Sequence, residues 1–107
     1  MTRYVFVGQS GPAEGRESEF NDWYLKKHMP EMLKIAGVVS VRRFKLAGAQ
    51  LPKMPTPQQY LAIYEIESDA PETFVKDMIA RAMSGQLPSS TPASAPGSTG
   101  VLWEEQK

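Results

Sequence analysis

The side chains best suited to chemistry in this sequence lie on one face of a segment with helical periodicity. His28 is the only histidine of the 107 residues, and Phe20 and Tyr24 precede it at four-residue steps. Residues four apart share a face of an α-helix, so we expect His28 to face the core. An imidazole titrates near about 6.5 and can exchange a proton with a carbon acid or a leaving hydroxyl. We therefore predict His28 as a catalytic general acid or base, with Tyr24 supporting the imidazole or orienting a substrate carbonyl.

A structural role for the same two residues is the alternative. The ring of His28 would then hydrogen-bond a backbone carbonyl that Pro30 leaves free, because proline has no N–H to donate. Tyr24 would be a core residue whose hydroxyl reaches water. Both interpretations are open from the residue types and spacing.

Further aromatic side chains can build the wall of a pocket around these groups. Strand alternation places Tyr4 with Phe6 and Tyr60 with Tyr64, each pair on one face of its strand. Such a set suits an aromatic or polyketide-like ligand, and an aromatic dimer interface is the alternative. The predicted substrate-binding residues are Tyr4, Phe6, Phe20, Trp23, Tyr60 and Tyr64.

A metal site is not expected. One histidine and no cysteine leave only carboxylates to complete a ligand set, and none has suitable spacing from His28. Arg42 and Arg43 point to opposite faces of their strand, so at least one needs a carboxylate partner. We expect that partner to be Glu65, Glu67 or a substrate.

The patterns around these residues predict the order β-α-β-β-α-β. Strands are expected at residues 3–8, 38–46, 60–67 and 101–105, where β-branched and aromatic residues lie between turn-forming ones. Helical spacing of apolar residues runs from 16 to 28, restarts at Pro30, and recurs from 69 to 84. This is the ferredoxin-like α+β fold, a four-stranded antiparallel sheet with two helices on one face. The other face needs a cover, and a second sheet is the natural one.

Length and composition limit the classes of function. A chain of 107 residues predicts a single domain, 1–107. Residues 86–100 are uncharged and mostly Ser, Pro, Thr, Ala and Gly, which predicts a flexible surface loop.

Lys plus Arg equals Asp plus Glu at 12 each, so neither nucleic acid nor a membrane is an expected partner. Without cysteine or a long apolar run, the cytoplasm is the expected location.

The segment from Phe20 to Phe44, FNDWYLKKHMPEMLKIAGVVSVRRF, resembles the first helix and second strand of the dimeric α+β barrel superfamily, and within it the EthD-like family. The pattern comprises an aromatic pair, a histidine with a proline two residues later, a glycine, and a strand that carries an arginine and a phenylalanine. These residues are Trp23, Tyr24, His28, Pro30, Gly37, Arg43 and Phe44. The resemblance implies a homodimer in which two sheets pack face to face, with a cleft in each subunit between the sheet and its own helices. The superfamily includes cofactor-free monooxygenases, polyketide cyclases, lactone isomerases, dehydratases and haem enzymes, so the fold alone does not define the reaction.

Two functions of different classes remain. The first is a small cofactor-independent enzyme, a lyase or dehydratase, cyclase or isomerase, that acts on an aromatic or polyketide-like molecule with His28 as acid or base. The second is a non-catalytic homodimer that binds a small molecule or assists a partner enzyme. Haem bound through His28 is a lesser alternative, and it would give a coloured protein.

Overall fold

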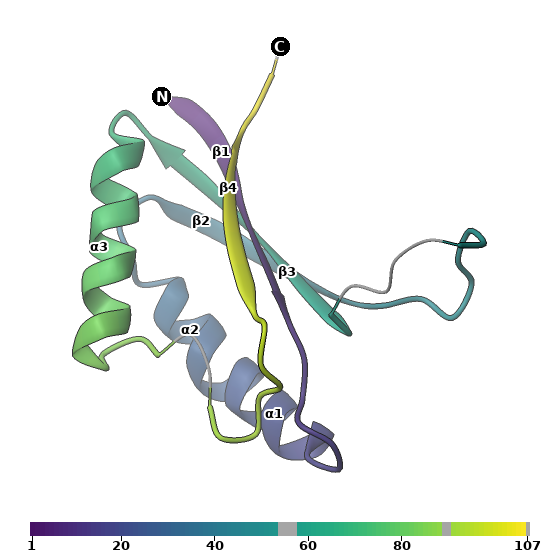
Figure 1. The fold of residues 1–107 in the computed structure, drawn as a ribbon. Coiled ribbons are helices and arrows are strands. Elements are labelled where there is room, and N and C mark those ends of the chain that lie inside the picture. The colour runs from purple at the N-terminus through teal and green to yellow at the C-terminus, as the bar shows by residue number, and fades with distance from the viewer. Residues whose placement is uncertain (54–57, 89–90, 107) are drawn as a thin grey trace.

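The elements of the chain follow the predicted order. The computed structural model describes residues 1–53, 58–88 and 91–106. Within these ranges it contains β1 (Thr2–Ser10), α1 (Glu17–Trp23), η1 (Tyr24–His28), α2 (Met29–Met32), β2 (Val38–Lys45), β3 (Tyr60–Ser68), α3 (Pro71–Ser84) and β4 (Thr99–Glu104). Here α1, η1 and α2 follow one another directly and form the first of two helices (Figure 1).

The four strands form one antiparallel sheet in the order β2-β3-β1-β4. β2 and β3, which are consecutive in the chain, pair with each other, and β1 lies between β3 and β4. Figure 1 shows the two helices on the same side of this sheet. The predicted ferredoxin-like α+β fold is therefore confirmed.

The strand register decides which face of the sheet meets the helices. Tyr4 and Phe6 of β1 lie opposite Ile66 and Tyr64 of β3, and alternate residues of β3 starting at Tyr60 are buried. The sequence left open which set of strand residues faces inward, and the buried set is the aromatic one. Its members pack with the first helix around Phe20, which is fully buried.

The opposite face of the sheet carries apolar side chains that the described chain leaves exposed. Phe44 of β2, Val101 and Trp103 of β4 are 40%, 46% and 59% exposed. Strand pairing sets Trp103 against Val5 and Val101 against Val7, so these four residues form an apolar strip over β4 and β1, whereas Phe44 lies opposite Leu61 at the other edge of the sheet. We call this whole side of the sheet the open face, and it is the surface that the resemblance would place against a second copy.

The first helix changes pitch where the sequence predicts an interruption. Residues Tyr24–His28 form a π-helical turn, in which the Met29 N–H donates to the Tyr24 carbonyl five residues back. Pro30 explains the change, because its ring clashes with the carbonyl four residues earlier and it has no N–H to donate. One widened turn resolves the clash, and the helix then continues through Met29–Met32. The expected interruption is thus a π turn rather than a break.

The segment before β4 is more firmly docked than its composition suggests. Leu87 and Ala93 are buried, at 4% and 0% exposure. The Ala13 N–H donates to the Ala93 carbonyl at 2.6 Å, and the Ala95 N–H donates to Gly11 at 2.8 Å. β4 also begins at Thr99 rather than at 101. Residues 89–90 of the predicted loop lie outside the described ranges, and its flexibility stays a prediction.

None of the helices in the described part of the chain has the length and hydrophobicity that crossing a membrane requires.

Candidate functional site

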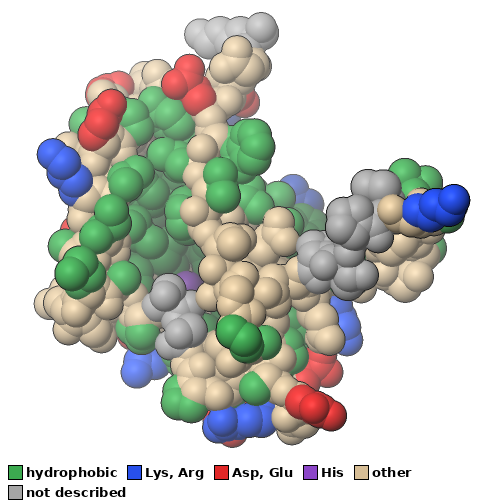
Figure 2. All heavy atoms as spheres, in the orientation of Figure 1, with side chains coloured by type: hydrophobic (Ala, Val, Ile, Leu, Met, Phe, Trp, Pro, Cys, Tyr) green, Lys and Arg blue, Asp and Glu red, His purple; other side chains and the backbone are tan. Residues whose placement is uncertain are grey.

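A cavity of about 460 Å³ lies between α3, the first helix and the strands β1 and β4. Figure 2 shows it as a hollow beside α3, with hydrophobic side chains inside and His28, the only histidine, visible at its lower end. This volume falls in the range of roughly 300–1,000 Å³ that small-molecule pockets occupy. The lining residues are Phe6, Gly8, Gln9, Ser10, Tyr24, His28, Met32, Tyr64, Phe74, Val75, Met78, Ile79, Ala82, Leu87, Ser98, Thr99 and Gly100.

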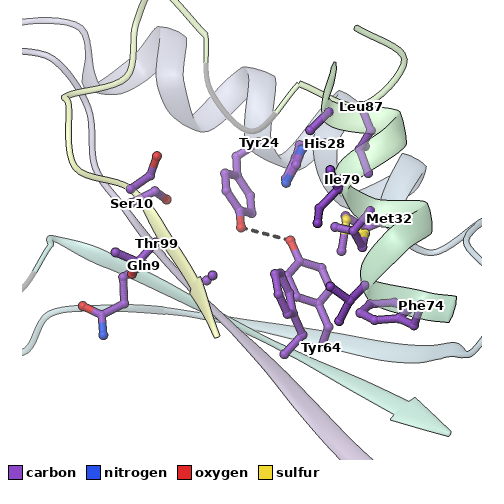
Figure 3. A pocket seen from close by; sticks show the side chains of 17 residues that line it. Gln9, Ser10, Tyr24, His28, Met32, Tyr64, Phe74, Ile79, Leu87 and Thr99 are labelled. Atoms are coloured by element: carbon purple, nitrogen blue, oxygen red, sulfur yellow. Dashed lines mark hydrogen bonds between the residues drawn. The ribbon is translucent and has the colours of Figure 1, made fainter. Parts of the chain in front are cut away.

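The lining has an apolar and a polar part. α3 contributes only apolar side chains, including Phe74, Met78 and Ile79, whereas Ser10 and Thr99 come from strand ends. Figure 3 shows Ser10 and Thr99 on one side of the Tyr24 ring, with His28, Ile79 and Phe74 on the other. No Asp, Glu, Lys or Arg occurs among the described residues that line the cavity. A neutral ligand with an apolar body and a few oxygen atoms matches this wall.

His28 is held between two aromatic rings. Its imidazole stacks on Trp23 with ring centroids 4.8 Å apart and meets the edge of Tyr24 at 4.9 Å. Trp23 and His28 are five residues apart, a spacing that a regular α-helix turns to different faces. The π turn brings the two rings together, and so the local helix geometry orients the imidazole.

The environment of His28 keeps its imidazole neutral. Burial lowers the pKa of His28 to about 4, because the charged form loses solvation. The Nδ1 atom is buried and has no hydrogen-bond partner among the described residues. The structural alternative, in which the ring hydrogen-bonds a freed carbonyl, therefore finds no support at Nδ1.

Tyr24 and Tyr64 form the polar centre of the cavity. Their hydroxyl oxygens lie 2.9 Å apart, as the dashed line in Figure 3 shows. Burial raises the pKa of both hydroxyls, so both are protonated at neutral pH. One proton bridges the two oxygens, and the other is free to bind a ligand oxygen. Tyr24 contacts His28 only through its ring, so of its two predicted roles the geometry suits carbonyl binding.

The predicted binding residues divide into two groups. Phe6 and Tyr64 line the cavity. The other four lie outside its lining: Phe20 is in the core, Trp23 lies behind His28, Tyr60 donates a hydrogen bond to Glu17 at 2.9 Å, and Tyr4 lines a separate hollow beside Trp103. Two of the six predicted binding residues thus line this cavity, and direct ligand contact by any of the six stays a prediction.

Sequence reasoning did not assign α3 to the site, although its signal was present. Phe74, Met78 and Ile79 belong to the apolar side of the predicted helix, and the resemblance placed a cleft between the sheet and its helices without naming α3 residues. Ile79 is 54% exposed and lines the cavity. The paired strand glycines Gly8 and Gly100 were also missed, and they leave the cavity floor without side chains.

Within the described ranges, no three His, Cys, Asp or Glu side chains gather into a group able to hold a metal ion.

Comparison with known proteins defines the fold but not the activity. No protein-family model matches the sequence, and no curated protein matches it. A solved structure of an ethyl tert-butyl ether D (EthD) family protein from Bacillus halodurans C-125 matches with a TM-score of 0.58 at 16% identity. The match covers 99% of this chain and all of the other. The chain therefore has the fold of an EthD family protein, as the resemblance implied.

Proposed function

We propose that the chain is a small cofactor-independent enzyme of the lyase, cyclase or isomerase kind. Its substrate would be a neutral aromatic or polyketide-like molecule bound in the cavity between α3 and the first helix. One observation carries the proposal: an imidazole that is neutral at physiological pH lines the same uncharged cavity as a pair of protonated tyrosine hydroxyls. A base and an oxygen-binding donor in one apolar pocket are the parts that enolisation needs.

The chemical step is a proton transfer from a carbon next to a carbonyl group. His28 takes the proton, and the electron pair of the C–H bond forms the C=C bond of an enolate. The carbonyl oxygen gains negative charge and accepts a hydrogen bond from the Tyr24–Tyr64 pair. Return of the proton to another carbon gives an isomer. Attack of the enolate carbon on a second carbonyl forms a C–C bond and closes a ring, and the alkoxide left by that carbonyl takes the proton back from His28.

The low pKa of His28 limits which substrates can react. A group with a pKa of about 4 is always in its basic form near neutral pH, but it binds a proton weakly. It therefore suits carbon acids activated by two carbonyl groups, whose protons leave easily. Alternating carbonyls of this kind are the defining feature of polyketide-like molecules.

We further propose that the protein is a homodimer joined through the open face. Phe44 of β2 and Val101 and Trp103 of β4 are exposed apolar side chains on this face, and leaving such side chains in water is unfavourable. A second copy presents the same side chains, as a two-fold interface requires. The cavity lies on the helix side of the sheet, so pairing through the open face leaves its mouth accessible.

Hydrogen–deuterium exchange tests the proposed enzyme directly. An aryl 1,3-diketone is incubated in D₂O at a pH where the background exchange is slow, and loss of the activated C–H signal is followed by NMR. We expect the wild type to accelerate exchange and His28→Gln to lose the acceleration while still binding the diketone. Lys27→Gln, an exposed neighbour, is the matched control and should behave as the wild type.

A non-catalytic binding or accessory protein is the second candidate. The observation in its favour is that no carboxylate, lysine or arginine among the described lining residues can act as a second acid–base group. Equal binding by wild type and His28→Gln, with no exchange above background in either, would support it over the enzyme. An absorption spectrum of the same sample tests the haem alternative, since bound haem gives a Soret band.

A further inference from the structure

Arg43 lies directly behind the tyrosine pair, outside the cavity. It belongs to β2 and faces the helices, opposite Ala62 of β3. Its guanidinium carbon lies 4.6 Å from the centre of the Tyr24 ring and 4.3 Å from that of Tyr60. The cation is therefore packed against the ring of Tyr24, whose hydroxyl faces the cavity.

The charge of Arg43 has no carboxylate partner within the described chain. Its Nη2 donates to the neutral Asn21 Oδ1 at 2.7 Å, and its Nε is buried without a partner. The expected ion pair with Glu65 or Glu67 is wrong: strand alternation places Glu65 on the open face, and Glu67 pairs with Arg3 at 3.3 Å. A buried unpaired donor costs about 1–3 kcal/mol, so such an arrangement is costly for stability alone.

The nearest charged groups do not cancel this positive charge. Glu17 accepts a hydrogen bond from Tyr60 at 2.9 Å and pairs with Lys45 at 3.6 Å. These contacts, the Tyr60 hydrogen bond first, lower the pKa of Glu17, which stays ionised opposite the ammonium of Lys45. One negative and two positive groups thus lie beside Tyr60, and of these Arg43 also contacts the Tyr24 ring.

We propose that Arg43 is a positioning residue that supplies positive charge behind the Tyr24–Tyr64 pair and so favours an anionic oxygen on the bound ligand. The proposal rests on the proposed function and makes it more specific: the bound species would be an enolate or phenolate. The ligand enters neutral, because the lining is uncharged, and the negative charge develops only after it is bound.

The physical basis is Coulombic attraction through a desolvated pair of rings. Burial raises the pKa of Tyr24 and Tyr64, whereas the Arg43 charge acts to lower both. A hydroxyl made more acidic in this way is a stronger hydrogen-bond donor to a developing oxyanion. The effect would pass through Tyr24, because Arg43 does not line the cavity.

The test uses 4-nitrophenol, whose ionised form is yellow, as a stable mimic of an enol. The fraction of bound probe that is ionised is measured against pH for wild type, Arg43→Gln, Arg43→Lys and Arg42→Gln. Arg42 is the matched control, since it carries the same charge one residue away but lies on the open face over Phe44. We expect the ratio of bound phenolate to bound phenol to fall about tenfold in Arg43→Gln. Arg43→Lys should keep much of that ratio, and Arg42→Gln should keep all of it.

A second readout separates failure of this proposal from failure of the proposed function. Tyrosinate absorbance of the free protein is titrated in the wild type and in Arg43→Gln, and we expect ionisation at higher pH in the variant. If nitrophenol does not bind at all, the proposed ligand class fails and the tyrosine titration still judges Arg43. An unchanged phenolate ratio in Arg43→Gln, or tyrosine titrations that coincide, would overturn the role of Arg43.

Should Arg43→Gln unfold, Arg43→Lys is compared with Arg42→Lys, since both variants retain the charge. The ratio of bound phenolate to bound phenol should be lower in Arg43→Lys, because its ammonium lies in a different place from the guanidinium.

Discussion

The rings of Trp23 and His28 stack at a centroid separation of 4.8 Å with 24° between their planes, although the residues are five apart in sequence. The π turn at Tyr24–His28 makes this contact, and the indole covers one face of the imidazole. Since burial is the cause of the low pKa of His28, the pitch of one helical turn sets the protonation state of the candidate base.

Titration of His28 by NMR is the most direct check, because the only histidine gives a single imidazole signal. We expect a pKa of about 4 in the folded protein. Trp23→Ala should raise this value toward that of a solvated histidine by uncovering the ring. A pKa near 6.5 in the wild type would mean that the imidazole is solvated and the proposed environment is wrong.

Folding stability should decrease on acidification for the same reason. The unfolded chain has an ordinary histidine pKa near 6.5, so between about pH 6.5 and 4 it binds more protons than the folded chain. The stabilisation by neutral His28 is fully present above pH 6.5 and is lost as the pH falls through this window, by up to about 3 kcal/mol. Denaturant unfolding at several pH values measures it. Since carboxylates also titrate at low pH, the relevant quantity is the wild-type free energy of unfolding minus that of His28→Gln at each pH. The free energy of unfolding of His28→Gln itself should be nearly flat above pH 5.

The tyrosine hydroxyls should show strong coupling in a double-mutant cycle. Tyr24→Phe or Tyr64→Phe alone leaves one buried hydroxyl without its partner, which costs about 1–3 kcal/mol of unfolding free energy. Removing both leaves no unpaired group, so the double variant should be less destabilised than the sum of the singles. Additive effects in urea unfolding would show that the two hydroxyls do not interact.

Two directly paired glycines should respond differently to a methyl group. A Cβ at Gly100 would lie 2.5 Å from the Phe6 ring, whereas a Cβ at Gly8 would have its nearest neighbours at 3.9 Å. Gly100→Ala should therefore displace Phe6 into the cavity and cost about 1–3 kcal/mol. Gly8→Ala is the matched control and should keep wild-type stability, while weakening ligand binding because its methyl group lies beside the Tyr24 hydroxyl. Equal melting temperatures for the two variants would contradict this account of the cavity floor.

The proposed dimer interface can be tested with one charge. Trp103→Glu places a carboxylate in the open face and should convert a dimer of twice 11.9 kDa into a monomer in light scattering. Met83→Glu is the control, since Met83 is 84% exposed on α3, on the helix side of the sheet. A wild type that is monomeric at all concentrations would exclude the interface.

The fold was predictable because each element has a clear local pattern. Strand alternation at Tyr60–Ser68 and helical spacing at Pro71–Ser84 gave the correct element types, and their order defined the topology. The pairing of His28 with Tyr24 in one cavity was also predictable, because residues four apart face the same way. These are short-range properties, which a single sequence carries.

The remaining features depend on contacts between distant residues. Nothing local shows that Tyr64 meets Tyr24 across 40 positions, or that Arg43 packs on aromatic rings instead of pairing with a carboxylate. The buried Ala93 is docked by backbone hydrogen bonds between residues 93–95 and residues 11–13, and the Leu87 N–H donates to the Arg81 carbonyl, which composition cannot reveal. No residue of α3 was assigned to the site, because an apolar helix face has the same pattern whether it borders a core or a pocket.

The widened turn also determines how the site can change during evolution. One residue added to or removed from an α-helix rotates everything after it by about 100°, so losing the extra residue of the π turn would turn Met32 away from the core. Met32 is only 1% exposed, and selection for a folded protein is therefore enough to retain the turn. A descendant without the proposed activity would still inherit the stacked histidine. In related sequences a retained helix length therefore indicates selection for a stable fold. Substitutions at Tyr64 or Arg43 say more about whether the chemistry of the site has changed.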